Sequence, residues 1–343
     1  MVRYHLITLI AMLVCMTNCH HQVASIVVYD KTFDEIHAIS SDLNQSYCIV
    51  LLDSTQKFSM QYKAMIQSSS STKSVVFDLI DINNPNNEWF LQWLCPLSLP
   101  LTCVFSAHGN LIDLIPGSTQ ESLLYTFEAM TNGQMTNYHY ANRFNMRKRE
   151  LVPLLDNVLK CYSQIQQGVF IPEAFSESLD YPYAYYLKII GGQLNNDSTC
   201  AISAANNMIA FTTPYYIDLY RNEILIAKKI INPKFDIRKE PHIRVSNDNV
   251  VLKYLEQDKT IPFEITVYND GEARLDISKI YLSCSCLKLD TIDYFSIPPK
   301  DSVKIHLTFQ IEKKGESFRE FFITSNAINN PIQHIAVTAR QLQ

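Results

Sequence analysis

Short apolar runs alternate with segments of helical periodicity over residues 25–130. The runs from Tyr47 to Leu52 and from Val75 to Ile82 are nearly unbroken, which is typical of strands covered on both faces. A further strand is predicted from Ser25 to Tyr29, and a hairpin is predicted to turn at Gly109. Helices are predicted between and after these strands, at residues 32–43, 55–67, 86–97 and 118–130. The alternation predicts an α/β domain.

Residues 131–240 are predicted to form a helical region. Their first part, 131–145, is polar and aperiodic, and it is predicted to be a linker or a loose loop. Four apolar stripes with helical spacing follow, and the second stripe is expected to end at Gly191-Gly192. For the tyrosines of this stripe, packing in a helix core is favoured over a ligand-binding surface; they are Tyr181, Tyr183, Tyr185 and Tyr186.

The period of the pattern changes to two in residues 241–343. Ile261 to Tyr268 and Val303 to Phe309 alternate between apolar and polar positions, and Asn269-Asp270-Gly271 predicts a turn. Further strands are predicted at residues 275–277, 318–324 and 334–339. Many short alternating strands in about 100 residues are typical of an immunoglobulin-like β-sandwich. The fold class predicted for the whole chain is therefore multidomain, with α/β and all-β parts joined by a helical middle segment.

Length, charge and motifs narrow the range of functions. A chain of 343 residues suits two or three domains. The formal net charge of −5 gives nucleic-acid binding no electrostatic support, and the basic run Arg147-Lys148-Arg149 is interpreted as a solvated helix face. The chain has no glycine-flanked serine, no paired carboxylate motif and no spacing of zinc ligands. We therefore predict no catalytic residues and no cofactor.

The N-terminus has the pattern of an export signal. Arg3 precedes an apolar stretch over residues 6–14, which is too short to span a membrane but suits the core of a signal peptide. Cys19 follows at a distance that resembles bacterial lipoprotein signals, in which the cysteine is acylated after cleavage. Asn18 stands where these signals have a small residue, so a secretory signal cut near Ala24 and an uncleaved anchor remain alternatives. The favoured prediction is a signal peptide over residues 1–19 and lipidation of Cys19.

The first domain carries three segments in a recognisable order. Val76 to Asn83 is an apolar run with an acidic end, Pro100 lies in a short loop, and Phe105 to Gly117 is the hairpin. Together they resemble the thioredoxin fold, and the resemblance implies that Pro100 is a cis-proline. Redox enzymes of that family use a Cys-x-x-Cys pair at a helix N-terminus. The corresponding segment here, Asp53 to Ser59, has no cysteine, so thiol–disulfide oxidoreductase activity is not expected.

Five short motifs mark the C-terminal module. They are Asn269-Asp270-Gly271, Leu275-Asp276-Ile277, Cys284-Ser285-Cys286, Pro298-Pro299-Lys300 and Ser325-Asn326. In this order they resemble a bacterial immunoglobulin-like family of unknown function, related to the modules named after abnormal spindle and Hydin. The family's signature is Asn-x-Gly, Leu-x-Ile, Cys-Gly-Cys, Pro-Gly and Ser-Asn. Ser285 and Lys300 stand where the signature has glycine.

Cys284 and Cys286 form the candidate thiol or metal site. In an extended strand their Cα atoms would lie about 6.5–7 Å apart, so a disulfide between them needs a bent backbone. The pair fits structural thiols at a strand end, which are favoured, a redox or disulfide pair, or two ligands of a soft metal ion such as Cu(I). The motif offers no third ligand, so the metal stays unassigned. Cys95 and Cys103 flank the proline loop and are a second candidate for a disulfide.

Two functions follow from these observations. The favoured one is a non-catalytic, membrane-anchored lipoprotein of the cell envelope, facing the periplasm or the cell surface. It would act as a binding or scaffolding module for another envelope protein or a glycan. The alternative is a thiol-handling protein, with a redox, copper or chaperone-like role, that uses Cys284 and Cys286. A binding module should tolerate serine at both positions, whereas a thiol-handling protein should lose its activity or its metal.

Overall fold

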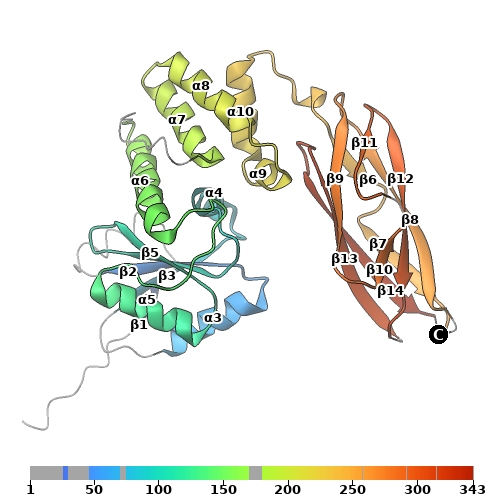
Figure 1. Ribbon diagram of the computed structural model, residues 1–343, viewed down its shortest axis with the longest axis horizontal. Helices are drawn as coiled ribbons and strands as arrows, with labels where there is room; N and C mark the ends of the chain where they lie inside the picture. Colours follow the sequence, from blue (N-terminus) through green and yellow to red (C-terminus); the bar gives the residue numbers. More distant parts are fainter. Residues whose placement is uncertain are drawn as a thin grey trace, which may run out of the picture. The chain divides into compact units, whose positions relative to one another are not determined.

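The computed structural model describes residues 26–29, 46–69, 75–169, 180–256, 258–290, 292–313 and 315–342. These residues belong to two compact units, 1–160 and 161–343. The expected signal peptide with Cys19, and the expected helix at 32–43, lie outside the described residues. Over the part of the chain that is described, no helix has both the length and the apolar character needed to cross a membrane. The predicted combination of helices, sheets and a β-sandwich is confirmed (Figure 1).

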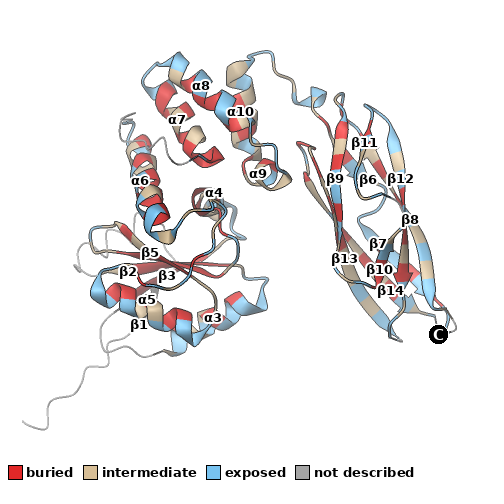
Figure 2. Ribbon diagram, in the orientation of Figure 1, coloured by how far each residue is buried: buried red, intermediate tan, exposed pale blue. Residues whose placement is uncertain are grey.

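The first unit contains a five-stranded sheet in the order β1-β3-β2-β4-β5. Its strands are β1 (Ile26–Tyr29), β2 (Tyr47–Leu52), β3 (Val75–Asp81), β4 (Leu101–Phe105) and β5 (Leu111–Pro116). β1 and β2 run parallel to β3, β4 runs antiparallel to β2, and β5 runs antiparallel to β4. Every residue of β2 and β4 is buried, which is the reason for their unbroken apolar sequences (Figure 2).

Helices cover both faces of this sheet (Figure 1). They are α3 (Lys57–Ser68), α4 (Glu88–Leu94), α5 (Gln120–Asn132) and the first part of α6 (Lys148–Gln166). α3 and α5 lie on one face, where Tyr62 and Leu123 join the apolar core. α4 lies on the other face beside the start of α6, and Nε1 of Trp93 donates a hydrogen bond of 2.9 Å to the carbonyl of Leu155. The sheet is therefore buried between two helical layers.

The polar segment between α5 and α6 is ordered on the edge of the sheet. Thr136 and Tyr140 are buried. The backbone N–H and the hydroxyl of Thr136 donate to Oδ2 of Asp113 at 2.8 and 2.6 Å. Asn142 binds the backbone of Met146 with both ends of its side-chain amide. The prediction of a loop is confirmed, since no helix or strand lies in the fully described segment between α5 and α6. The loop is not loose, because a buried carboxylate on β5 requires hydrogen-bond donors and this segment supplies them.

The second unit begins with a group of helices. They are α7 (Pro182–Leu194), α8 (Ser198–Ile209), α9 (Pro214–Leu219) and α10 (Arg221–Ile231). Tyr181 and Tyr183 are buried, as the favoured interpretation of helix-core packing requires. The prediction that the second stripe ends at Gly191-Gly192 is wrong, because α7 continues to Leu194. A Cβ atom at Gly192 would lie 2.9 Å from the backbone nitrogen of Ala201, so the glycine lets the first turn of α8 pack closely.

The rest of the second unit is a β-sandwich of two sheets, with strand orders β10-β12-β8-β6 and β11-β9-β13-β14-β7 (Figure 1). The strands are β6 (Ile243–Val245), β7 (Asn249–Tyr254), β8 (Thr260–Asn269), β9 (Leu275–Leu282), β10 (Leu287–Leu289), β11 (Phe295–Ile297), β12 (Ser302–Gln310), β13 (Glu316–Ser325) and β14 (Ile332–Gln341). Their inward-facing residues form one core that includes Val267, Ile305, Phe321 and Val337. The predicted two-residue period is the alternation between this core and solvent.

Candidate functional site

The segment that lacks the Cys-x-x-Cys pair is a hydrogen-bonded polar network at the ends of β2 and β3. Oδ1 of Asp53 accepts from the backbone and hydroxyl of Thr55 at 2.9 and 2.6 Å, and from Nδ2 of Asn83 at 2.9 Å. Oδ1 of Asp81 accepts from the backbone N–H of Ser54 at 3.3 Å and from both nitrogens of Asn83. The network joins the two loops through hydrogen bonds and offers no nucleophilic thiol.

Both carboxylates of this network are held ionised. Partial desolvation acts to raise the pKa of Asp53, but hydrogen bonds from Thr55 and Asn83 outweigh it and lower the pKa below its usual range. The pKa of Asp81 is lowered in the same way by Ser54 and Asn83. A carboxyl whose pKa is depressed by folding contributes stability above its usual pKa, and this contribution is lost as the pH falls through the folded-state value.

Replacing Asn83 by alanine removes a donor from both carboxylates. We expect Asn83→Ala to raise the pKa of Asp53 and of Asp81, and to lower the free energy of unfolding at neutral pH by about 0.5–1 kcal/mol. Carboxyl chemical shifts followed by NMR across acidic pH measure the first effect, and urea unfolding measures the second. Asn86→Ala, at an exposed position in the same loop, is the control. Unchanged carboxyl titrations in Asn83→Ala would contradict the role of the network.

Two thiols on the sheet of the first unit are not placed for exchange. Cys48 and Cys103 lie on β2 and β4 with no exposed surface. Burial raises the pKa of both thiols well above the usual range, and for Cys48 the neighbouring Cys103 adds to the effect. Cys103 is a free thiol, so the candidate disulfide between Cys95 and Cys103 is wrong. The Leu99–Pro100 peptide bond is cis, the isomer that the thioredoxin resemblance implies.

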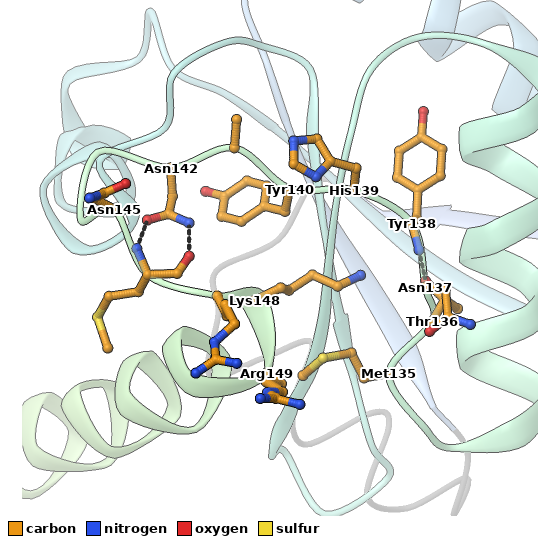
Figure 3. A pocket seen from close by; sticks show the side chains of 13 residues that line it. Met135, Thr136, Asn137, Tyr138, His139, Tyr140, Asn142, Asn145, Lys148 and Arg149 are labelled. Carbon is orange, nitrogen blue, oxygen red and sulfur yellow. Dashed lines mark hydrogen bonds between the residues drawn. The ribbon is translucent and has the colours of Figure 1, made fainter.

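An open pocket of about 670 Å³ lies beside the segment between α5 and α6 (Figure 3). Pockets that bind small molecules have volumes of about 300–1,000 Å³. The lining combines polar and apolar surface in similar amounts, with side-chain amides, tyrosines, a histidine, two methionines and the basic run at the start of α6. The residues that could bind a ligand through hydrogen bonds include Asn137, Tyr138, His139 and Asn145.

The basic run contributes little net charge to this pocket. Lys148 is almost buried and forms an ion pair of 2.6 Å with the fully buried carboxylate of Asp113. Arg147 and Arg149 are exposed, at 2.9 and 3.8 Å from the carboxylate of Glu150. The three cations of the basic run therefore pair with two carboxylates, those of Asp113 and Glu150, and leave a net charge of one. For Arg147 and Arg149 this arrangement agrees with the interpretation of a solvated face, whereas for Lys148 that interpretation is wrong because its side chain is only 10% exposed. The pocket chemistry suits hydroxyl or amide groups better than phosphate.

The two cysteines of the candidate thiol or metal site form a disulfide with each other. The two cysteines do not lie in an extended strand, because β9 ends at Leu282 and β10 begins at Leu287. The chain bends at the cysteines, and their Cα atoms lie 5.2 Å apart, within the range of disulfides. The backbone N–H of Gln310 donates to the carbonyl of Cys286 at 2.7 Å, which attaches the bend to β12.

The disulfide limits the chemistry that Cys284 and Cys286 can carry out. In a disulfide neither sulfur is a thiolate, so the pair in this form cannot bind a soft metal ion as two thiolate ligands. Within the described residues, no group of three or more His, Cys, Asp or Glu side chains is arranged to hold a metal ion. The favoured prediction of two structural thiols is therefore wrong, and the pair is a disulfide.

Two other parts of the signature have structural roles. Nδ2 of Asn269, which is buried, donates to the carbonyls of Ala273, Ile297 and Pro298, and its Oδ1 accepts from Gly271. Asn326 accepts from the backbone N–H of Asp276 at 2.9 Å. These amides satisfy backbone groups between strands, so they account for the Asn-x-Gly and Ser-Asn motifs without any ligand.

Sequence reasoning missed three residues of these sites. Asp113 is a lone acid in an apolar strand, which is a readable signal of a buried charge that needs a partner. The prediction of a solvated face is wrong for Lys148, because its buried partner Asp113 lies 35 positions earlier in the chain and no local pattern connects the two. Arg319 donates from Nε to Sγ of Cys286 at 3.0 Å, and no local spacing connects these two residues.

Comparison with known proteins finds a family model that matches part of the second unit. Residues 243–339 match a family model described as "Protein of unknown function (DUF1573)". No curated protein matches the chain. The sandwich is therefore a domain of unknown function with an immunoglobulin-like fold, as the sequence resemblance implies.

The similarity to solved structures extends over about a third of this chain. A protein of unknown function from Porphyromonas gingivalis W83 is 16% identical with a TM-score of 0.28, and the match covers 32% of this chain and 50% of that one. The ASH/PapD-like domain of human CEP192 is 9% identical with a TM-score of 0.25, covering 33% and 92%. The E. coli chaperone DraB is 14% identical with a TM-score of 0.24, covering 29% and 55%. The chain thus spans half the length of the Porphyromonas protein.

Proposed function

We propose that this chain is an exported envelope lipoprotein, anchored through Cys19, that acts by binding rather than by catalysis. Its first unit is a thioredoxin-like domain without redox chemistry, and its sandwich is a second binding or scaffolding module. The sheet order β1-β3-β2-β4-β5, with two antiparallel strands after the parallel ones, supports the thioredoxin-like assignment. Another envelope protein or a glycan is the proposed partner.

The observation that carries the proposal is the polar network at Asp53, Asp81 and Asn83. A redox enzyme of this type needs an exposed, activated thiol at that position. Here the position has hydrogen-bonded carboxylates and an amide. The thiols of Cys48 and Cys103 are buried, with raised pKa values. Thiol exchange by Cys48 or Cys103 would therefore require partial unfolding, whereas binding requires none.

The pocket beside the segment between α5 and α6 is the proposed binding surface of the first unit. Side chains such as Asn137, Tyr138 and Asn145 can donate and accept hydrogen bonds in several directions. Sugar hydroxyls and peptide amides both present such groups, and neither demands a high density of charge. The attachment of this segment to Asp113 gives the surface a fixed shape in advance of binding.

A turnover assay tests the absence of catalysis. The purified chain with Cys284→Ser and Cys286→Ser, which leaves only the thiols outside the sandwich motif, is mixed with insulin and dithiothreitol. We expect disulfide reduction at the rate of dithiothreitol alone, because the buried thiols of Cys48 and Cys103 cannot attack. A thioredoxin serves as the positive control. Catalytic acceleration that disappears in Cys48→Ala or Cys103→Ala would overturn the proposal.

A further inference from the structure

The Cys284–Cys286 disulfide is asymmetric in its exposure. Cys284 is half-buried beside the core, Ser285 is exposed, and Cys286 is 1% exposed. A thiolate from another molecule can therefore reach the sulfur of Cys284 more readily than that of Cys286. In thiol–disulfide exchange the accessible sulfur is attacked and the other sulfur leaves as a thiolate. The two cysteines thus differ in how closely another molecule can approach them.

A guanidinium group is positioned at the buried sulfur. Nε of Arg319, on β13, donates to Sγ of Cys286 at 3.0 Å. Nη1 of the same side chain donates to the carbonyl of Phe318 at 2.7 Å, and Nη2 lies 3.5 Å from a carboxylate oxygen of Glu312. These contacts hold the cation in place before any negative charge develops on the sulfur. A fixed cation stabilises a leaving thiolate, and a better leaving group makes exchange faster.

The short span of this disulfide argues against a purely structural role. A disulfide stabilises a fold mainly by restricting the unfolded chain, and the effect grows with the length of the closed loop. Only one residue separates Cys284 from Cys286. The bend also has other attachments, since the backbone N–H of Ser283 donates to the carbonyl of Glu320 at 3.1 Å. The bond therefore adds less to stability than a long-range disulfide would.

We infer that the Cys284–Cys286 disulfide is an exchange site for a dithiol of the cell envelope, with Cys284 as the attacked sulfur, Cys286 as the leaving thiolate and Arg319 as the residue that stabilises it. This role goes beyond the proposed binding function, which needs no exchange. The partner is identified by its chemistry as a protein with two neighbouring thiols.

The exchange balances in two steps. A thiolate of the partner forms a bond with Sγ of Cys284, the bond between the two sulfurs breaks, and Cys286 takes the electron pair and then a proton. The partner's second thiolate then attacks the partner's first sulfur, which is bonded to Sγ of Cys284 in the mixed disulfide. This step releases Cys284 as a thiolate, which is then protonated. The partner is oxidised from a dithiol to a disulfide, and the sandwich gains two electrons and two protons. No other oxidant or reductant is required.

The first test locates the attacked sulfur. The folded, oxidised chain is treated with reduced glutathione, quenched with acid, alkylated and analysed by peptide mass spectrometry. We expect at least about fivefold more glutathione on Cys284 than on Cys286. Glutathione mainly on Cys286 would overturn the assignment. Reduction that occurs only when urea unfolds the chain would overturn the exchange site itself.

The second test measures the contribution of Arg319. We expect Arg319→Gln to slow reduction by dithiothreitol about three- to tenfold at constant pH, and Arg319→Lys to retain most of the wild-type rate. Arg340→Gln is the matched control, because Arg340 pairs with Glu316 on the same sheet and the wild-type rate is expected. Equal rates in Arg319→Gln and wild type would contradict the role of the cation. If Arg319→Gln does not fold, two other results test the proposal: the rate at which dithiothreitol reduces Arg319→Lys, and the cysteine on which glutathione is found in the first test.

Discussion

Replacing Asp113 by alanine is expected to lower the stability of the first unit by about 3–5 kcal/mol, because it leaves a buried ammonium group without its counter-charge. The side chain of Asp113 has no exposed surface, and Nζ of Lys148 lies 2.6 Å from it with 10% exposure. The substitution also removes the acceptor of two hydrogen bonds from Thr136. The segment between α5 and α6, and the pocket beside it, would lose their attachment to β5.

Tryptophan fluorescence during urea unfolding measures this effect, because the two tryptophans of the chain, Trp89 and Trp93, both lie on α4. Glu150→Ala is the control; its side chain is 42% exposed and pairs with exposed arginines, so a change within about 0.5 kcal/mol is expected. The double variant Asp113→Leu with Lys148→Met should recover most of the loss, since it removes both charges. A loss below about 1 kcal/mol in Asp113→Ala would contradict the account.

Replacing Gly271 by alanine is expected to destabilise the sandwich by about 3 kcal/mol. A Cβ atom at this position would lie 2.1 Å from the carbonyl oxygen of Glu240 and 2.8 Å from the backbone nitrogen of His242. Both contacts are with backbone atoms, so no side-chain rotation relieves them. The segment that leads into β6 would have to move, and the hydrogen bond of 2.9 Å from Asp270 to the carbonyl of His242 would be lost.

Amide hydrogen exchange of Asp270 and thermal unfolding by circular dichroism measure the two consequences of Gly271→Ala. Gly315→Ala is the control, because no heavy atom lies within 4 Å of its Cβ position. Its φ of +99° still disfavours alanine, so a cost of about 1 kcal/mol is expected there. Equal losses in the two variants would mean that close approach of the backbone is not the reason for glycine in the Asn-x-Gly motif.

The parts of the fold that the sequence predicts well are those set by local periodicity. β2 is an unbroken apolar run because both faces of the strand are covered, and β8 and β12 alternate because one face meets the core. Those patterns arise within a single element and can be read without knowledge of its neighbours. The Asn269-Asp270-Gly271 turn is predicted for the same reason.

The parts that the sequence does not predict depend on contacts between distant residues. α7 contains Gly192 in its interior because the backbone of Ala201 on α8 packs against that position too closely for a side chain. The order of the segment after α5 follows from Asp113, more than twenty positions earlier. The bend at Cys284 follows from the end of β9, a boundary that alternation does not fix. Each feature is a tertiary contact that overrides a local preference.

The candidate site also has features that the sequence predicts and features that depend on contacts between distant residues. The absence of cysteine from Asp53 to Ser59 is visible in the sequence, and it correctly excludes a Cys-x-x-Cys pair from that loop. The interaction that replaces the pair depends on Asn83, which reaches both Asp53 and Asp81 only in the folded chain. The Cys-x-Cys motif is likewise visible, whereas the cation beside it comes from another strand.

Mapping every cysteine in protein taken directly from the cell envelope, with thiols blocked at lysis, tests the proposal of an anchored binding protein most directly. The account predicts that mass spectrometry finds Cys19 acylated, Cys284 and Cys286 outside any stable metal complex, and Cys48 and Cys103 as unmodified thiols. A mixed disulfide or an oxidised sulfur on Cys48 or Cys103 would contradict it, because the first unit would then carry out the thiol chemistry that its structure is proposed to have lost.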